Sequence, residues 1–324
     1  MSIRRWWRVA TMVVTAAVLT ACTDPPLQSL YTVERGGAFH ASLNADGSRV
    51  VVSSVADGAM LWRVADGERV HVWSHVEGRE NAIIVTAFSV DGRRVVTAER
   101  DSVVMWDVDT GRALGSWALA GRVESLALSS HGRVLVAGLR DHTAVVIETR
   151  TNRVAHAIQL PSVVNAVAVS ADGRFLAAGA DDGSFGVWDL SNGTERLSWK
   201  FSGGVSAIAI AADARHVYAG RYHGKGRVWN LRNGELVSEI GHDRSSMISA
   251  RFSADGNRLL TGLPAGRVML WDVASGRMLT ERAAPRGEFW RPTAMVAVDV
   301  AFGGTENELV AVFSSGAVMR WPSH

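Results

Sequence analysis

The sequence predicts an all-β fold built from one unit that is repeated seven times. Short stretches that alternate apolar and polar residues are separated by turn residues such as Asp91-Gly92. The same order of stretches and turns returns at a period of 41 to 50 residues, and a large apolar residue marks each unit. Self-similarity at such a period indicates a repeat architecture rather than two ordinary domains. The seven markers are Trp62, Trp106, Ile147, Trp188, Trp229, Trp271 and Trp321.

The chain begins with a segment typical of an export signal. Arg4, Arg5 and Arg8 precede an apolar run over 9–19. The run is too short to span a bilayer, which takes about 20 residues. We therefore expect residues 1–21 to be a signal peptide.

The end of this run, Leu19-Thr20-Ala21-Cys22, resembles a bacterial lipobox. The resemblance implies that Cys22, the single cysteine, receives diacylglycerol and becomes the first residue of the mature protein. An ordinary signal peptide cut nearby is the alternative. At least two acyl chains would hold the protein durably at a membrane, whereas one chain binds only marginally. Residues 22–26 would form a short tether, with the plasma or the outer membrane as the anchoring membrane.

The charge balance argues against nucleic acid as a partner. The chain has 34 Lys and Arg against 32 Asp and Glu, and three of the arginines lie in the acid-free first 21 residues. The remaining chain carries 31 basic and 32 acidic residues. Such a near-neutral body lacks the broad positive field on which binding to a phosphate backbone depends.

The clearest repeat unit combines Asp91-Gly92, Trp106-Asp107 and Thr110-Gly111 with the apolar stretches between them. The same motifs return as Asp172-Gly173, Trp188-Asp189 and Asn192-Gly193, and again as Asp255-Gly256, Trp271-Asp272 and Ser275-Gly276. In these motifs and their spacing the chain closely resembles the WD-repeat β-propeller family, from Leu27 to Trp321. The resemblance implies a seven-bladed β-propeller over 27–324, with four strands in each blade.

The two ends of the repeat region predict how the ring closes. The last unit stops at Trp321 to His324 and lacks a fourth strand, whereas a spare strand over 27–33 precedes the first unit. A propeller has to close its ring to hide its sheet edges. We expect the spare strand to complete the seventh blade.

The repeats depart from the family in the polar residues that support each blade. The resemblance implies a tetrad of a Gly-His, a Ser or Thr, an Asp in the tight turn and the marker Trp. Gly241-His242 is the single Gly-His, and an Asp six residues before the marker occurs only at Asp141 and Asp182. We expect these hydrogen-bond belts to be mostly missing. The outer-strand residues Trp73, Trp117 and Trp199 are interpreted as rim packing, with a lateral docking strip as the alternative.

No sequence motif indicates catalysis, a cofactor or a metal site. His71 and His75 are the closest histidine pair, but no clustered Cys or carboxylate pair accompanies them. The segment 220–225 lacks the glycine spacing and the Ser or Thr of a phosphate loop. We expect no catalytic residue, no cofactor and no metal, although propeller enzymes assemble sites from distant blades that one sequence hides.

The loops of one face, called top in this family, carry the candidate recognition residues. These loops join second to third strands, and fourth strands to the next blade. The longest marker step, 50 residues, contains a Pro-bounded aromatic loop whose residue types are enriched in binding hot spots; tucking of its aromatics against its own blade is the alternative. The candidates are Arg100, Arg140, His142, Arg221, Tyr222, His223, Arg286, Phe289, Trp290 and Arg291.

We expect a membrane-anchored, extracytoplasmic scaffold, monomeric by itself, that binds a protein or peptide on the top face. The alternatives are a cell-envelope assembly factor and a propeller hydrolase or quinoprotein-like enzyme with a site in the central channel. In the family the outer strand runs from bottom to top. The five steps from Cys22 to Leu27 span at most ~18 Å, which would hold the bottom rim near the bilayer.

Overall fold

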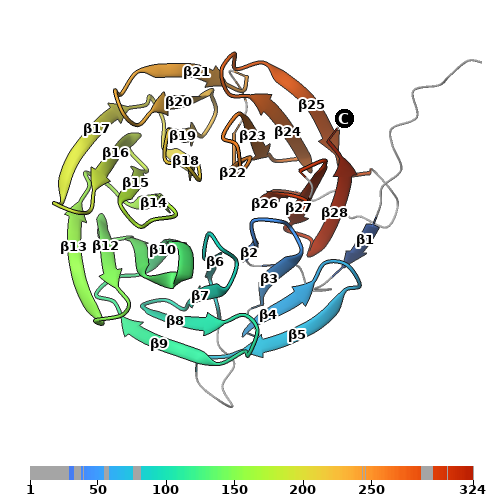
Figure 1. Ribbon diagram of the computed structural model, residues 1–324, viewed down its shortest axis with the longest axis horizontal. Coiled ribbons are helices and arrows are strands. Elements are labelled where there is room, and N and C mark those ends of the chain that lie inside the picture. The colour runs from blue at the N-terminus through green and yellow to red at the C-terminus, as the bar shows by residue number, and fades with distance from the viewer. Residues whose placement is uncertain are drawn as a thin grey trace, which may run out of the picture.

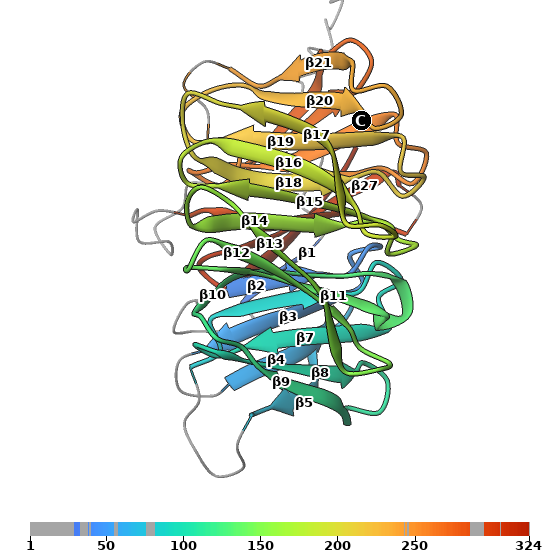
Figure 2. The ribbon, with the colours of Figure 1, turned by 90° about the vertical axis from the view of Figure 1, so that its left-hand side faces the viewer.

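The computed structural model shows a ring of seven antiparallel four-stranded sheets around a central axis (Figure 1). It describes residues 29–32, 38, 40–54, 58–75, 82–242, 244, 246–285, 295–304 and 306–323. The predicted signal peptide, Cys22 and the tether lie outside these residues. The strands run across the thickness of the disc (Figure 2), and the described residues contain only one short 3₁₀ turn, η1 (Ser130–Gly132), beside them. The predicted all-β seven-bladed propeller is confirmed.

Each blade is a meander of four consecutive strands from the inner to the outer position. Blades 1 to 3 contain β2 (His40–Leu43), β3 (Arg49–Ser54), β4 (Gly58–Arg63), β5 (Glu68–Trp73), β6 (Val85–Phe88), β7 (Arg94–Ala98), β8 (Ser102–Asp107), β9 (Ala113–Ala118), β10 (Val123–Leu128), β11 (Val134–Leu139), β12 (Thr143–Glu148) and β13 (Arg153–Gln159). Blades 4 and 5 contain β14 (Val164–Val169), β15 (Phe175–Ala180), β16 (Ser184–Asp189), β17 (Thr194–Lys200), β18 (Val205–Ile210), β19 (His216–Arg221), β20 (Gly226–Asn230) and β21 (Leu236–Ile240). Blades 6 and 7 contain β22 (Ser249–Phe252), β23 (Arg258–Gly262), β24 (Arg267–Asp272), β25 (Met278–Ala283), β26 (Ala297–Phe302), β27 (Glu308–Phe313) and β28 (Ala317–Pro322).

The fourth strand of blade 7 comes from the other end of the repeat region. It is β1 (Ser29–Thr32), which pairs antiparallel with β28, Ser29 opposite Arg320 and Thr32 opposite Ala317. Since β28 runs from the top face to the bottom face, β1 starts at the bottom and runs upward. The chain therefore enters the propeller from its bottom face.

The recurring Asp-Gly motif forms the tight turn between the first and second strands. In blade 2, Ser89 Oγ donates to Asp91 Oδ1 at 2.6 Å, and the Arg93 backbone N–H donates to the same oxygen at 3.3 Å. Gly92 adopts φ +69°, a conformation that disfavours any residue with a Cβ. Blades 4 and 6 repeat this turn, with Ser170 donating to Asp172 and Ser253 donating to Asp255.

Outer-strand tryptophans pack against the marker of the following blade. The Trp73 ring stacks on Trp106 of blade 2 with centroids 5.6 Å apart, and Trp199 stacks on Trp229 of blade 5 at 4.3 Å. Trp117 is buried in the same cluster as Ile147, the marker of blade 3. These contacts confirm rim packing as the role of the three residues, because each ring packs against the marker residue of the neighbouring blade.

The expectation that polar belts are mostly missing needs a correction in blade 2. Trp106 Nε1 donates to Thr97 Oγ1 at 2.8 Å, and the same oxygen lies 2.8 Å from His75 Nε2. His75 Nδ1 lies 3.0 Å from Ser102 Oγ and 3.5 Å from the Glu99 carboxylate. The histidine follows Ser74 rather than Gly, and Glu99 lies seven residues before the marker rather than six, so the family pattern did not reveal this network.

Candidate functional site

The top face of the disc is formed by the loops that carry the candidate residues. Its second-to-third-strand loops lie around 99–101, 140–142, 181–183 and 222–225, on the consecutive blades 2 to 5. The loops that lead into the next blade lie beside them at 119–122, 160–163, 201–204 and 241–248. The candidates that the structure describes therefore share one arc of this face.

Backbone hydrogen bonds connect these loops in pairs, within a blade and between neighbouring blades. The Val123 N–H donates to the Arg100 carbonyl oxygen at 2.8 Å, the Leu160 N–H to that of His142 at 2.8 Å, and the Tyr222 N–H to that of Gly204 at 3.0 Å. A loop whose backbone groups are satisfied in this way loses little further freedom on binding. The top face is therefore a preorganised surface.

Blades 2 and 3 contribute Arg100, Arg140 and His142, all of which are exposed. Arg140 Nη1 lies 3.4 Å from Glu124 Oε1, which also lies 3.4 Å from Arg122 Nε. His142 has φ +75°, and its backbone adopts this left-handed conformation at the turn into β12. Because two guanidinium groups share the single carboxylate of Glu124, a net positive charge remains beside it.

Blade 5 contributes Arg221, Tyr222 and His223. Arg221 donates from Nε to the Lys225 carbonyl oxygen at 3.2 Å and from Nη1 to Ser202 Oγ, so its guanidinium is tied into the loop. The Tyr222 side chain is 41% exposed, and partial burial together with the nearby Asp181 carboxylate raises its pKa. The His223 N–H donates to Ser246 Oγ at 3.1 Å. Tyr222 is thus an exposed aromatic ring on a braced loop.

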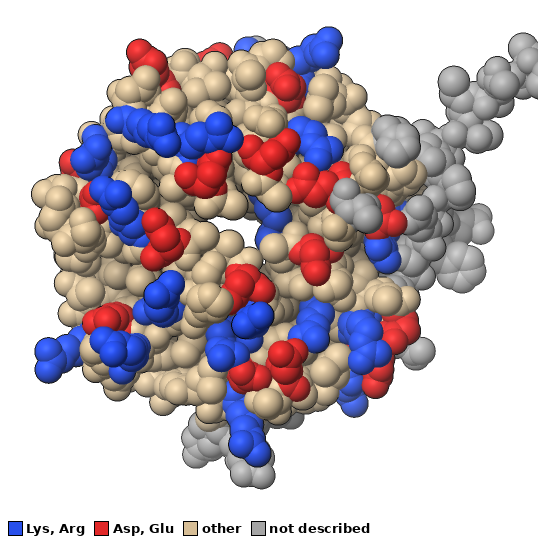
Figure 3. All heavy atoms as spheres, in the orientation of Figure 1, with Lys and Arg blue, Asp and Glu red and all other residues tan. Residues whose placement is uncertain are grey.

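The remaining four candidates, Arg286, Phe289, Trp290 and Arg291, lie outside the described residues. The structure thus brings six of the ten candidates onto one face. Figure 3 shows the opposite, bottom face, on the side where β28 ends; Lys, Arg, Asp and Glu alternate over it around an opening at its centre.

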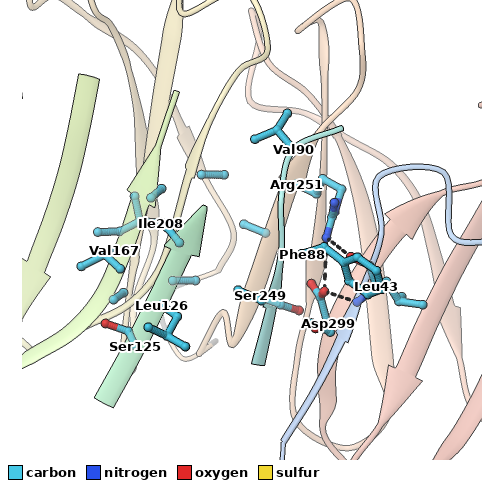
Figure 4. A pocket seen from close by; sticks show the side chains of 18 of the residues that line it. Leu43, Phe88, Val90, Ser125, Leu126, Val167, Ile208, Ser249, Arg251 and Asp299 are labelled. Atoms are coloured by element: carbon cyan, nitrogen blue, oxygen red, sulfur yellow. Dashed lines mark hydrogen bonds and ion pairs between the residues drawn. The ribbon is translucent and has the colours of Figure 1, made fainter. Parts of the chain in front are cut away.

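A central channel of about 530 Å³ runs along the ring axis between the inner strands. Its two sides differ (Figure 4): Leu126, Val167 and Ile208 line one side, and Arg251 and Asp299 lie on the other. The size suits a small ligand, but pockets with a bound ligand also need polar groups that are free to orient it.

Two of the four charged side chains that line the channel, Arg251 and Asp299, join blades 6, 7 and 1, and the other two, Glu124 and Glu306, form ion pairs with Arg140 and Arg258. Arg251 donates from Nε to the Val300 carbonyl oxygen at 2.7 Å, and from Nη2 to the Leu43 carbonyl oxygen at 3.0 Å and to Asp299 Oδ2 at 3.2 Å. Asp299 Oδ2 in turn accepts the Leu43 N–H at 2.7 Å. The position of Arg251 is Ala in most other blades, for example Ala127 and Ala168. No repeat motif therefore revealed this set of contacts between blades 6, 7 and 1.

A second polar group on the channel wall belongs to blades 1 and 2. His40 Nδ1 lies 3.3 Å from Thr86 Oγ1, which lies 3.0 Å from Ser42 Oγ. Burial lowers the pKa of His40, an effect that the charge of Asp299 opposes. A neutral, hydrogen-bonded histidine of this kind holds two blades together.

The described residues contain no group of three or more His, Cys, Asp or Glu side chains that could hold a metal ion. Within the same residues no helix is long and apolar enough to cross a membrane. The His71 and His75 pair is used in packing, since His71 stacks on Trp73 and His75 belongs to the blade 2 network.

Comparison with known proteins agrees with this geometry. The family model described as WD domain, G-beta repeat matches residues 152–189 and 234–272. A chain of the crystal structure of the mitotic checkpoint complex superimposes with a TM-score of 0.77 at 16% sequence identity, over 99% of this chain and 100% of that one. At this identity the similarity concerns the fold alone. The comparison with curated proteins gave no match.

Proposed function

We propose that this seven-bladed propeller with WD repeats is a membrane-anchored, extracytoplasmic scaffold that binds a protein or peptide partner on its top face and catalyses nothing. The observation that supports this best is the braced arc of blades 2 to 5. There Arg140 and Tyr222 are exposed on loops whose backbone groups are already paired. Tyr and Arg are enriched in binding hot spots, and preorganised loops lower the entropic cost of binding.

The channel favours binding over catalysis. Its Arg251 and Asp299 side chains are committed to each other and to backbone groups of neighbouring blades. A general acid or base has to reach a substrate proton, and a group used to hold the ring together is poorly placed for that role. The exposed side chains that can contact a partner lie on the top-face loops instead.

The anchor is the second part of the proposal. The lipobox-like Leu19-Thr20-Ala21-Cys22 precedes β1 by only a few residues, and β1 starts at the bottom face. A lipid at Cys22 would leave the top face directed away from the membrane. Partners in solution or in the cell wall could then reach it.

Crosslinking on isolated membranes tests the binding surface. We expect the intact protein to capture one partner, and the double variant Arg140→Ala/Tyr222→Ala to lose it. A second variant, Phe289→Ala/Trp290→Ala, tests the loop of the longest repeat step. The matched control is Glu195→Ala/Arg196→Ala, which changes two exposed residues at the bottom end of β17.

Capture that survives both top-face variants would contradict the proposed surface, and equal loss in the control would do the same. The anchor is tested separately with Cys22→Ser. We expect this variant to leave the membrane fraction, and its retention there would contradict lipid anchoring.

A further inference from the structure

The bottom ends of three outer strands carry an exposed arginine beside an exposed aliphatic side chain. In blade 2, Arg112 precedes Leu114, which is 47% exposed; in blade 3, Arg153 precedes Val154, which is 61% exposed. In blade 6, Arg277 precedes Met278, which is 38% exposed. Single exposed aliphatic residues are ordinary, but here each lies within two residues of an exposed arginine at the bottom end of its strand.

The bottom-face carboxylates do not neutralise these arginines. In blades 2 and 4 the acids after the third strand are paired with arginines from other turns: Arg49 binds Asp109 at 3.0 Å, Arg174 binds Asp189 at 2.9 Å, and Arg94 binds Asp107. In blades 3 and 6 Glu148 and Asp272 accept hydrogen bonds from Thr151 and Ser275 instead. Within the described part of the chain, Arg112 and Arg153 have no ion pair. Hydrogen bonds from Ser275 lower the pKa of Asp272, with a smaller effect of the Arg277 charge, and no ion pair joins Arg277 to a carboxylate of the described residues. Guanidinium groups at these three places are thus open to an external anion.

The chain enters the propeller from the same side. Seven steps separate Cys22 from Ser29, the first residue of β1, and they span at most ~25 Å. Blade 7, which contains β1, neighbours blade 6 on the ring, whereas blades 2 and 3 lie further round it (Figure 1). The entry point, the exposed side chains of blades 2 and 3, and those of blade 6 therefore lie at three places on the bottom edge of the disc.

We propose that this bottom rim, formed by Arg112, Leu114, Arg153, Val154, Arg277 and Met278, docks on the anionic surface of the lipid bilayer. Arginine forms charge-assisted hydrogen bonds with phosphate, and aliphatic side chains enter the interface between headgroups and acyl chains. Contacts spread over separate blades suit an extended flat partner better than a compact one. The inference rests on the lipid anchor of the proposed function and adds that the disc lies flat on the membrane.

The single native cysteine makes a direct test possible, because Cys22 is blocked once it carries lipid. Leu114→Cys, Val154→Cys and Met278→Cys each introduce one free thiol for an environment-sensitive fluorophore. Val72→Cys is the matched control, since Val72 is 53% exposed near the top end of the outer strand β5. The full-length lipidated protein is reconstituted in vesicles of phosphatidylcholine with phosphatidylglycerol, and doxyl-labelled lipids serve as quenchers.

We expect a blue shift and quenching at the three bottom positions and neither at Val72. The triple variant Arg112→Glu/Arg153→Glu/Arg277→Glu should abolish both effects, while the top-face triple variant Arg100→Glu/Arg122→Glu/Arg140→Glu should retain them. Pure phosphatidylcholine vesicles should weaken both effects. Unquenched bottom probes, or equal quenching at Val72, would overturn the proposal. Probes that are shielded without vesicles would identify a protein contact or a second copy instead, and would overturn it too.

Failure of the anchor is recognised independently. Mass spectrometry of the purified protein shows whether Cys22 carries acyl chains. If the acyl chains are absent, the anchor is wrong. Flotation of the full chain with the anionic vesicles then tests whether the bottom rim binds lipid without an anchor. Absence of flotation would overturn the lipid-docking surface.

Discussion

The junction between blades 1 and 2 and the junction between blades 4 and 5 use the same marker tryptophan in different ways. In the first, Trp106 stacks on Trp73 and also donates to Thr97, which is hydrogen-bonded to His75. In the second, Trp229 lies in an apolar cluster and stacks on Trp199 at 4.3 Å and on Phe185 at 5.4 Å. One junction is partly polar and the other is apolar.

The residue at one position of the second strand, next to the marker tryptophan, decides whether the junction is polar or apolar. Thr97 and Thr261 occupy it in blades 2 and 6, and both accept the indole N–H of their marker tryptophan. Ala219 occupies it in blade 5, and Val52 in blade 1, where the buried Trp62 Nε1 has no hydrogen-bond partner among the described residues. The polar junction should respond to pH, and the apolar one should respond mainly to loss of volume.

The largest effect is expected at the apolar junction. Trp229→Ala removes a fully buried ring from between two blades, and such truncations cost about 3–5 kcal/mol of unfolding free energy. Urea denaturation of the purified protein measures this cost, with Leu114→Ala as the exposed control. A loss below about 1 kcal/mol would show that stacking does not hold these blades together.

The next effect is expected from the polar junction. Thr97→Val keeps the shape but leaves the Trp106 indole N–H and a ring nitrogen of His75 without this partner, at a cost of about 1–3 kcal/mol. Thr261→Val is the comparison variant, because it breaks the bond from Trp271 and the 3.3 Å bond to the Met269 carbonyl oxygen but no bond to a histidine. Equal losses in the two variants would argue against a contribution of His75.

Acid should weaken the polar junction specifically. Burial lowers the pKa of His75 to about 4, so the unfolded chain binds a proton below about pH 6.5 where the folded chain does not. Stability from this group is therefore complete above that pH and falls as the pH drops toward 4. Between pH 7 and pH 5 we expect the native protein to lose about 2 kcal/mol more than His75→Gln.

Denaturation curves of both proteins at the two pH values give this difference. The Trp229→Ala variant should keep the native pH dependence, since His75 lies in another junction. A native pH dependence that His75→Gln leaves unchanged would contradict the assignment.

The smallest expected effect is an increase in the free energy of unfolding. Val52→Thr in blade 1 places a hydroxyl where blades 2 and 6 have theirs, and pairing of the Trp62 indole should raise the unfolding free energy by about 1 kcal/mol. Thermal unfolding would show a higher melting temperature. A lower one would indicate that the Trp62 indole and the new hydroxyl do not meet.

The sequence predicted the blades well and the polar contacts poorly. The Asp91-Gly92 turn and the marker Trp106 specify geometry within a few residues, so their repetition indicated the number of blades and their order. His75 escaped detection because its partners Thr97 and Glu99 are recognised only when β7 and the loop before β6 are brought together. The same limit applied to Arg251 and Asp299, which lie on different blades.

The sequence by itself determined the all-β repeat, the strand order and the loops that carry Arg140 and Tyr222, because turn chemistry and alternation act between neighbouring residues. Only the tertiary structure decided which side chains remain available. Folding tied Arg221 into its own loop, committed Arg251 to the ring closure, and left Arg112 and Arg153 on the bottom rim without an ion pair to any described residue. The physical reason is that hydrogen bonds and ion pairs between blades depend on distances in space, which the positions along one chain do not contain.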